Sequence, residues 1–105
     1  MTLQQFEQTL KKYCPNLVYH LAAPKGLHRC VVWHSYGYSS AFGDDRNQIN
    51  APKIQIDIHT QTVYDSLVED VISALWEMDL PFSIASEGFD DEYNDIRTIL
   101  QLVVM

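Results

Sequence analysis

The sequence predicts an α+β fold, with two helices packed on one face of a mainly antiparallel sheet of about four to five strands, in the order α-β-β-β-α-β-β. Three patterns lead to this prediction. Lys53–His59 (KIQIDIH) alternates polar and apolar residues with the period of two that a half-buried strand shows. The segment from Val63 to Met78 and the N-terminal segment instead repeat apolar residues every three or four positions, as amphipathic helices do.

The N-terminal segment is predicted to form the first helix. Its apolar stripe consists of Leu3, Phe6, Leu10 and Tyr13. Thr2 and Gln5 have the spacing of a capping box, and Lys11 and Lys12 stand where the helix dipole favours positive charge. Pro15 then prevents the helix from continuing.

Two strands are predicted to follow. Asn16–Ala22 (NLVYHLA) is a short apolar run, and Ala23–Gly26 (APKG) supplies a turn. The next stretch, from His28 to Phe42, reads as a second strand. One of its faces is expected to carry Cys30, Val32 and His34, and the other Val31, Trp33 and Ser35.

Phe42–Ala51 (FGDDRNQINA) is polar, contains glycine and shows no period. We expect a loop of about ten residues here, longer than the usual two to five of a hairpin. Two interpretations remain open: an ordinary connection, or a segment that becomes ordered only against a partner. On the second interpretation Gly43–Asn50 is mobile in the isolated chain, because only Ile49 offers an apolar anchor.

The strand Lys53–His59 and the helix after it are expected to form the centre of the core. Its inward residues, all β-branched, are Ile54, Ile56 and Ile58. The facing helical stripe is Val63, Leu67, Val71, Leu75 and Met78, widened by Val68 and Ile72. Thr62 is the expected N-cap, Asp65 the third helical residue, and Pro81 ends the helix. Residues 67, 71 and 75 should therefore pack on the three isoleucines.

The C-terminal part is expected to contain two further strands. Phe82–Ala85 forms a short one, Ser86–Asp95 an acidic turn, and Ile96–Val104 the last strand. Two helices cover only one face of such a sheet. Apolar residues expected on the other face are Val31, Trp33, Ile99 and Val103. An exposed apolar sheet face of this kind favours association with another molecule.

Length and charge limit the classes of function. At 105 residues, the chain fits one domain, 1–105, with one core. Fourteen acidic against seven basic residues give a formal net charge of -7, which disfavours binding to nucleic acid. No apolar run reaches the length of a membrane span, and the N-terminus lacks the pattern of a secretory signal, so we expect a soluble intracellular protein without a membrane partner. Cys14 and Cys30 are expected to be reduced.

Neither a catalytic site nor a metal or cofactor site is predicted. Cys30 and His34 share a strand face but lie about 13 Å apart, too far for a common ion or a nucleophile pair. His59 on a neighbouring strand remains an alternative partner for the thiol. Asp57 and His59 alternate outward and are expected to be wet or at an interface. Tyr36 and Tyr38 resemble a base-stacking platform, but the neighbouring aspartates would repel phosphate.

Three stretches carry a resemblance to a known family. They are SSAFGDDRNQINAPKIQIDIHTQ, TVYDSLVEDVISALWEMDLPF and EGFDDEYNDIRTILQLVV. The first resembles a polar loop leading into a strand of the type xxQIDIxT, the second an amphipathic helix closing before a phenylalanine-bearing strand, and the third an acidic, tyrosine-bearing turn before the last strand. Together, over Val31–Val104, they resemble the small tail-terminator and head-to-tail completion proteins of long-tailed bacteriophages.

The resemblance implies a structural virion subunit without enzymatic activity. Such subunits form a ring, commonly a hexamer, that caps the tail tube or joins it to the head, and they can remain monomeric until a tail is available. The implied partners are the tail tube protein and a head-side connector protein, met in the host cytoplasm and then in the virion. Another small head-tail connector, or an unrelated α+β interaction or regulatory domain, remains an alternative.

The candidate assembly-interface residues come from the long loop and from the strands. They are Asp44, Asp45, Arg46, Asn47, Asp57, His59 and Trp33. The resemblance implies that the long loop lies at an inter-subunit or tube-facing surface. Arg46 is expected to pair with a carboxylate of a neighbouring subunit, for which Glu87–Asp95 is a source.

Overall fold

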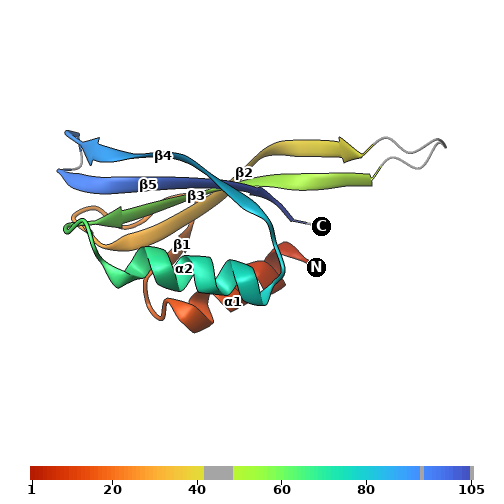
Figure 1. Ribbon diagram of the computed structural model, residues 1–105, viewed down its shortest axis with the longest axis horizontal. Coiled ribbons are helices and arrows are strands. Elements are labelled where there is room, and N and C mark those ends of the chain that lie inside the picture. The colour runs from red at the N-terminus through yellow and green to blue at the C-terminus, as the bar shows by residue number, and fades with distance from the viewer. Residues whose placement is uncertain (42–48, 93, 105) are drawn as a thin grey trace.

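Two helices lie on one side of a five-stranded sheet (Figure 1). The computed structural model describes residues 1–41, 49–92 and 94–104. Its elements are α1 (Leu3–Tyr13), β1 (Val18–His20), β2 (Cys30–Ala41), β3 (Ile49–Thr60), α2 (Ser66–Glu77), β4 (Phe82–Asp90) and β5 (Asp95–Val103). The predicted α+β class is confirmed. Neither helix in these ranges has the length and apolar character needed to cross a bilayer.

The strands lie in the order β1-β2-β3-β5-β4, so the chain enters the sheet at one edge and its fourth strand forms the other. β1 runs parallel to β2, and all other neighbouring pairs are antiparallel. Parallel neighbours require a connection that returns along the strands. Here the returning segment is residues 21–29, and part of it lies over the sheet face that the helices leave free.

α1 begins as the sequence predicts. The Thr2 hydroxyl accepts a hydrogen bond from the backbone N–H of Gln5 (3.1 Å), and the Gln5 side chain accepts one from the backbone N–H of Thr2 (2.9 Å). This reciprocal pair satisfies two donors that a helix start otherwise leaves open. Phe6 and Leu10 are fully buried on the inner face of the helix.

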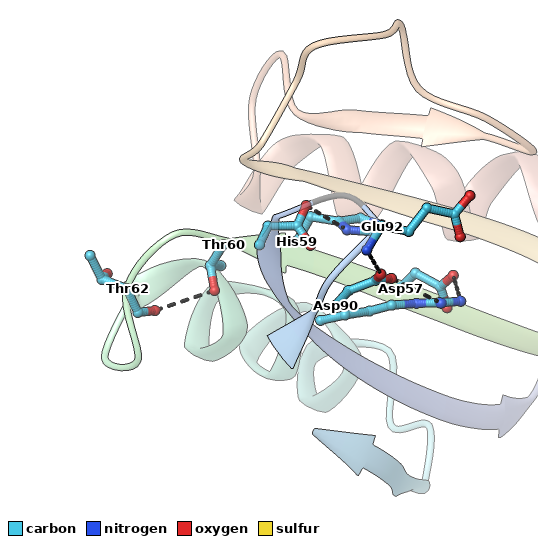
Figure 2. A network of polar contacts seen from close by, with 8 residues as sticks. Asp57, His59, Thr60, Thr62, Asp90 and Glu92 are labelled. Carbon is cyan, nitrogen blue, oxygen red and sulfur yellow. Dashed lines mark hydrogen bonds and ion pairs between the residues drawn. The ribbon is translucent and has the colours of Figure 1, made fainter. Parts of the chain in front are cut away.

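α2 begins later than predicted, because Asp65 and not Thr62 is its N-cap. The Asp65 carboxylate accepts from the backbone N–H of Leu67 (2.9 Å) and is held by two hydrogen bonds from Arg29. The Thr62 carbonyl instead accepts from the Thr60 hydroxyl (Figure 2). Val63, expected in the buried stripe, is 69% exposed. A charged cap fixed by a distant arginine therefore replaces the predicted threonine cap.

The core lies between the helices and one face of the sheet. It contains Phe6, Leu10, Cys14, Val18, Val31, Trp33, Ile54, Ile56, Ile58, Leu67, Val71, Ala74, Leu75, Leu80, Leu100, Leu102 and Val104. The predicted packing of residues 67, 71 and 75 with the three isoleucines of β3 is confirmed, since all six are fully buried in this cluster. The assignment of Val31 and Trp33 to the face without helices is wrong: both belong to the core.

The segment Ser86–Asp95 is mostly strand, where a turn was predicted. β4 continues to Asp90, which pairs with Asp95 at the start of β5. Glycine and acidic residues are weak strand formers, so the ladder with β5, and not local propensity, maintains this part of β4. A register shift between Ile84 and Ser86 marks a bulge in it.

β2 and β3 extend beyond the rest of the sheet (Figure 1). The ladder between β3 and β5 ends at Lys53 and Val103, whereas β2 and β3 stay paired as far as Ala41 and Ile49. Residues 38–41 and 49–52 thus form a two-stranded extension, called here the β2–β3 arm. The predicted loop is shorter than expected, because Ile49 and Asn50 already belong to β3. The predicted mobility of the remaining loop residues falls outside the part of the chain that the structure describes.

Candidate assembly surface

The sheet face opposite the two helices, called here the helix-free face, carries a mixture of polar and apolar side chains. By strand alternation and register it includes Cys30, Val32, Gln55, Asp57, His59, Arg97, Ile99 and Gln101. Two of the predicted interface residues, Asp57 and His59, therefore share this face. The structure brings them together with Asp90, Asp95 and Arg97 in one polar network (Figure 2).

Arg97 links three strands. Its Nη2 donates to Asp57 Oδ2 on β3 (2.8 Å), and its Nη1 lies 3.6 Å from Asp90 Oδ2 on β4. Gln55 Nε2 donates to the other carboxylate oxygen of Asp57 (2.9 Å). With both oxygens bonded, Asp57 is only 9% exposed, so the expectation that it is wet is wrong. A carboxylate tolerates this burial because a cation and an amide replace its hydration.

His59 makes the second contact of the network. Its Nδ1 lies 3.0 Å from Asp95 Oδ2, and the Asp95 side chain is 1% exposed. His59 is less wet than one of the two expectations required, since only 12% of its side chain is exposed; its place at an interface stays a prediction. Sequence reasoning placed Asp95 in a turn and so missed this pair. The missed signal was the alternation of Asp95, Arg97 and Ile99. It extends the predicted strand by one residue at its start and places Asp95 on the same face as Arg97.

A pocket of about 530 Å³ lies between residues 21–27 and the helix-free face. Its floor includes Cys30, His59 and Arg97. Among the residues that the structure describes, two buried polar atoms have no hydrogen-bond partner, Asp95 Oδ1 and Arg97 Nε. Both atoms belong to residues that line this pocket. The polar network therefore contains one acceptor and one donor without a hydrogen bond beside the pocket.

The alternative of a Cys30 nucleophile paired with His59 is tested by this geometry. Cys30 and His59 are cross-strand neighbours, and His59 in turn contacts Asp95. Cys30 is however 1% exposed, and burial raises its pKa to about 11. A buried thiol with a raised pKa is a poor nucleophile at neutral pH. No group of three His, Cys, Asp or Glu side chains suited to a metal ion occurs within 1–41, 49–92 and 94–104.

Trp33 lies away from this surface, which corrects its prediction as an interface residue. It is 3% exposed, and its ring meets the Phe6 ring edge-on with centroids 5.4 Å apart. The indole Nε1 donates to Glu7 (2.9 Å), and the imidazole of His20 stacks on the ring. Trp33 stands in the same cross-strand row as Ile56 and therefore faces the helices.

The predicted loop residues Asp44, Asp45, Arg46 and Asn47 lie outside the described part of the chain. They connect the two strands of the β2–β3 arm. Tyr36 and Tyr38, just before or at the start of this arm, are exposed. The start of the arm and the residues just before it thus expose two tyrosine side chains to solvent. The segment that the arm carries contains four of the seven candidate residues.

β4 supplies exposed apolar residues that sequence reasoning missed. Ile84 is 56% and Phe89 62% exposed, and every residue from Ser83 to Phe89 is exposed. β4 is an edge strand, and its outer side is open to a further strand. A nine-residue edge with apolar side chains is a second candidate contact surface, distinct from the arm.

Comparison with known proteins finds no matching family model, curated protein or solved structure.

Proposed function

We propose that this chain is a structural subunit that assembles with copies of itself into a ring, a hexamer by resemblance, at the end of a phage tail. In this role it caps the tail tube or completes the joint between head and tail, and it carries out no chemical step. The tail tube protein and a head-side connector are its proposed partners. The virion is its proposed final location, after assembly in the host cytoplasm.

The observation that carries this proposal is the β2–β3 arm. The arm continues for four paired residues on each strand beyond the ladder with β5. Within the described residues, no third strand or helix flanks it along most of its length (Figure 1). An isolated two-stranded ribbon is marginally stable in water. A subunit that maintains such an extension gains stability for it by packing the arm on a neighbouring molecule.

The sequence at the end of the arm supports the same role. Asp44, Asp45 and Arg46 offer charges of both signs for pairing across an interface. Arg46 is proposed to form a directed pair with a carboxylate of the neighbouring copy. Asp57 and His59 are proposed to support assembly indirectly, by holding β3 and β5 together beneath the surface, since both are largely buried.

Shortening the arm tests this function. Residues 40–50 are replaced by Asn-Gly, so that Ser39 and Ala51, which face each other in register, become the ends of a two-residue hairpin turn. We expect an almost unchanged melting temperature and loss of ring formation, measured by sedimentation velocity and negative-stain electron microscopy at rising protein concentration. A shortened protein that still forms rings would show that the arm is not the assembly element.

A charge reversal gives the finer test. Arg46→Glu should prevent ring formation while leaving the melting temperature unchanged, and Arg46→Lys, which keeps the charge, should retain most of the assembly. Equal assembly by both variants would contradict the proposed pair.

The pocket favours a second candidate, a small interaction or regulatory domain of the same topology. Asp57, His59 and Arg97, which line the pocket, would then meet a ligand or partner. The two functions predict different masses in solution. The ring subunit forms oligomers as its concentration rises or when tail tubes are added, whereas the regulatory domain stays monomeric under both conditions.

A further inference from the structure

The two edge strands of the sheet differ in charge and in what covers them. β4 is exposed along its length and carries Glu87, with Asp90, Asp91 and Glu92 at its end. β1 forms the opposite edge, next to the C-terminal turn of α1. A shallow groove there is lined by Lys11, Pro15, Asn16, Val18 and Tyr19. An acidic edge and an edge with a lysine-bearing groove are electrostatically complementary.

The strand registers place these two edges at the same level of the sheet. One cross-strand row runs Val18, Val31, Ile58, Thr98 and Glu87. Val18, Val31 and Ile58 belong to the core between sheet and helices, so Glu87 points to the same side. Ile84 and Phe89 pair with Leu100 and Ile96, which puts them on that side as well. Their exposure shows that the helices of the same chain leave β4 uncovered.

The backbone of β1 has hydrogen-bonding groups directed outward. Leu17 accepts from the N–H of Val31 (2.8 Å), and Leu21 donates to the carbonyl of Trp33 (2.9 Å), so the backbone groups of 17 and 21 point at β2. Because these groups alternate along a strand, those of Val18 point away from β2, toward the open edge. A further strand can pair there.

We infer that the β4 edge of one copy pairs with the β1 edge of the next, so that the sheet continues from subunit to subunit. This inference rests on the proposed ring function and names the surfaces that close the ring. β1 and β4 run in opposite directions within one sheet, so the new pair is antiparallel. Glu87 then meets the groove that holds Lys11 of the next copy. Its α1 extends over Ile84 and Phe89.

Other pairings of the same edges fit less well. Antiparallel pairing of β4 with β4 of a second copy, centred on Glu87, would place the two Glu87 side chains opposite each other, and like charges facing each other destabilise a strand pair. β1 with β1 offers only three residues on each side. A β4–β1 contact uses two different surfaces of each copy, and such head-to-tail contacts generate rings when the rotation closes.

Two charge reversals and their mixture test this inference. Glu87→Lys places lysine against Lys11, and Lys11→Glu places glutamate against Glu87. We expect each variant alone to associate about tenfold more weakly than the wild type, because like charges then meet at every contact. In an equimolar mixture, the lysine introduced at position 87 of the first variant can meet the glutamate introduced at position 11 of the second, and Glu87 of the second can meet Lys11 of the first. Every contact then joins opposite charges, so association should return to the wild-type level. Only a contact between these two edges predicts that rescue.

Glu69→Lys on α2 and Lys25→Glu are the matched controls, since each changes the net charge by the same amount at an exposed site outside the β4 and β1 edges. Each control has the same net charge as one of the two edge variants, and both controls should associate as strongly as the wild type. Phe89→Ser adds an independent variant that removes apolar contact without changing charge, and it should also weaken association. Thermal melts of all five proteins check that the fold is intact.

The outcomes separate the two proposals. Rings from both single reversals at wild-type concentrations would overturn the edge pairing and leave the ring function standing. Weakened variants without rescue in the mixture would likewise overturn it. A wild-type chain that sediments as a monomer at every concentration, both alone and with tail tubes present, would overturn the ring and the edge pairing together.

Discussion

The two faces of the sheet exclude water by different means. On the helix-covered face, β3 contributes isoleucines that are fully buried among apolar side chains. On the helix-free face, the same strand contributes Asp57 and His59, which are nearly as inaccessible because they pair with Arg97 and Asp95. Apolar burial needs volume and contact area, whereas polar burial needs a partner for each charged group. A substitution on the first face therefore acts through lost contact area and volume, and one on the second through a lost partner.

The largest expected effect lies on the helix-covered face. Leu75→Ala should lower the free energy of unfolding by about 2–5 kcal/mol, because it removes a fully buried side chain and leaves a cavity between α2 and β3. Val63→Ala, at the exposed position before α2, should change it by less than about 0.5 kcal/mol. Urea unfolding measures both. A Leu75→Ala loss below about 1 kcal/mol would show that the core does not depend on this contact.

The next effect tests the helix-free face. Asp57→Ala should lower the free energy of unfolding by about 1–3 kcal/mol, because Arg97 and Gln55 both lose their acceptor. Asp57→Asn keeps the shape and one oxygen, so its loss should be smaller. Asp91→Ala, an exposed acidic residue, is the control. If Asp57→Ala and Asp91→Ala unfold at the same urea concentration, polar pairing does not stabilise this face.

A smaller effect is expected at Asp65, where a charged pair fixes the start of α2. Asp65→Ala should cost about 0.5–2 kcal/mol through loss of the N-cap, whereas Asp65→Asn keeps a capping oxygen and loses the charge. Arg29 holds the pKa of Asp65 below its ordinary value of 3.8.

The sign of the pH dependence follows from that shift. A lowered pKa in the folded state stabilises the fold above pH 3.8, and this contribution disappears as the pH falls through the folded-state pKa. The unfolding free energy of wild type should therefore fall more steeply in acid than that of Asp65→Asn. Parallel acid titrations of the two proteins, followed by circular dichroism, would contradict a stabilising pair.

The smallest effect concerns the two thiols, one on each side of the sheet. Cys14 lies in the core with the helices and Cys30 on the helix-free face, and burial raises the pKa of each to about 11. Iodoacetamide at pH 8 should therefore label both slowly in the native protein and quickly in urea. Single-cysteine variants, Cys14→Ser and Cys30→Ser, separate the two rates. Rapid labelling of Cys30 alone would show that the polar face opens where the apolar face stays closed.

Local patterns in the sequence determined the elements whose signals lie within a few residues. The capping box of α1, the alternation of β3 and the stripe of α2 from Leu67 to Leu75 all follow from nearest-neighbour spacing and appear as predicted. The reduced state of the cysteines follows from their number and separation, and the structure shows both as free thiols. Short-range hydrogen bonds and periodicity suffice for such features.

Tertiary contacts decided the rest, because the relevant partners are distant in the chain. α2 begins at Ser66, with Asp65 as its N-cap, since Arg29, 36 residues away, holds that carboxylate. β4 extends through acidic residues to Asp90 because β5 supplies its ladder. β2 has apolar residues on both faces, so alternation alone did not show whether Trp33 faces the helices. Its packing against Phe6 of α1 shows that it does. The His59–Asp95 pair likewise exists only where β3 and β5 lie side by side, a pairing that no local pattern encodes.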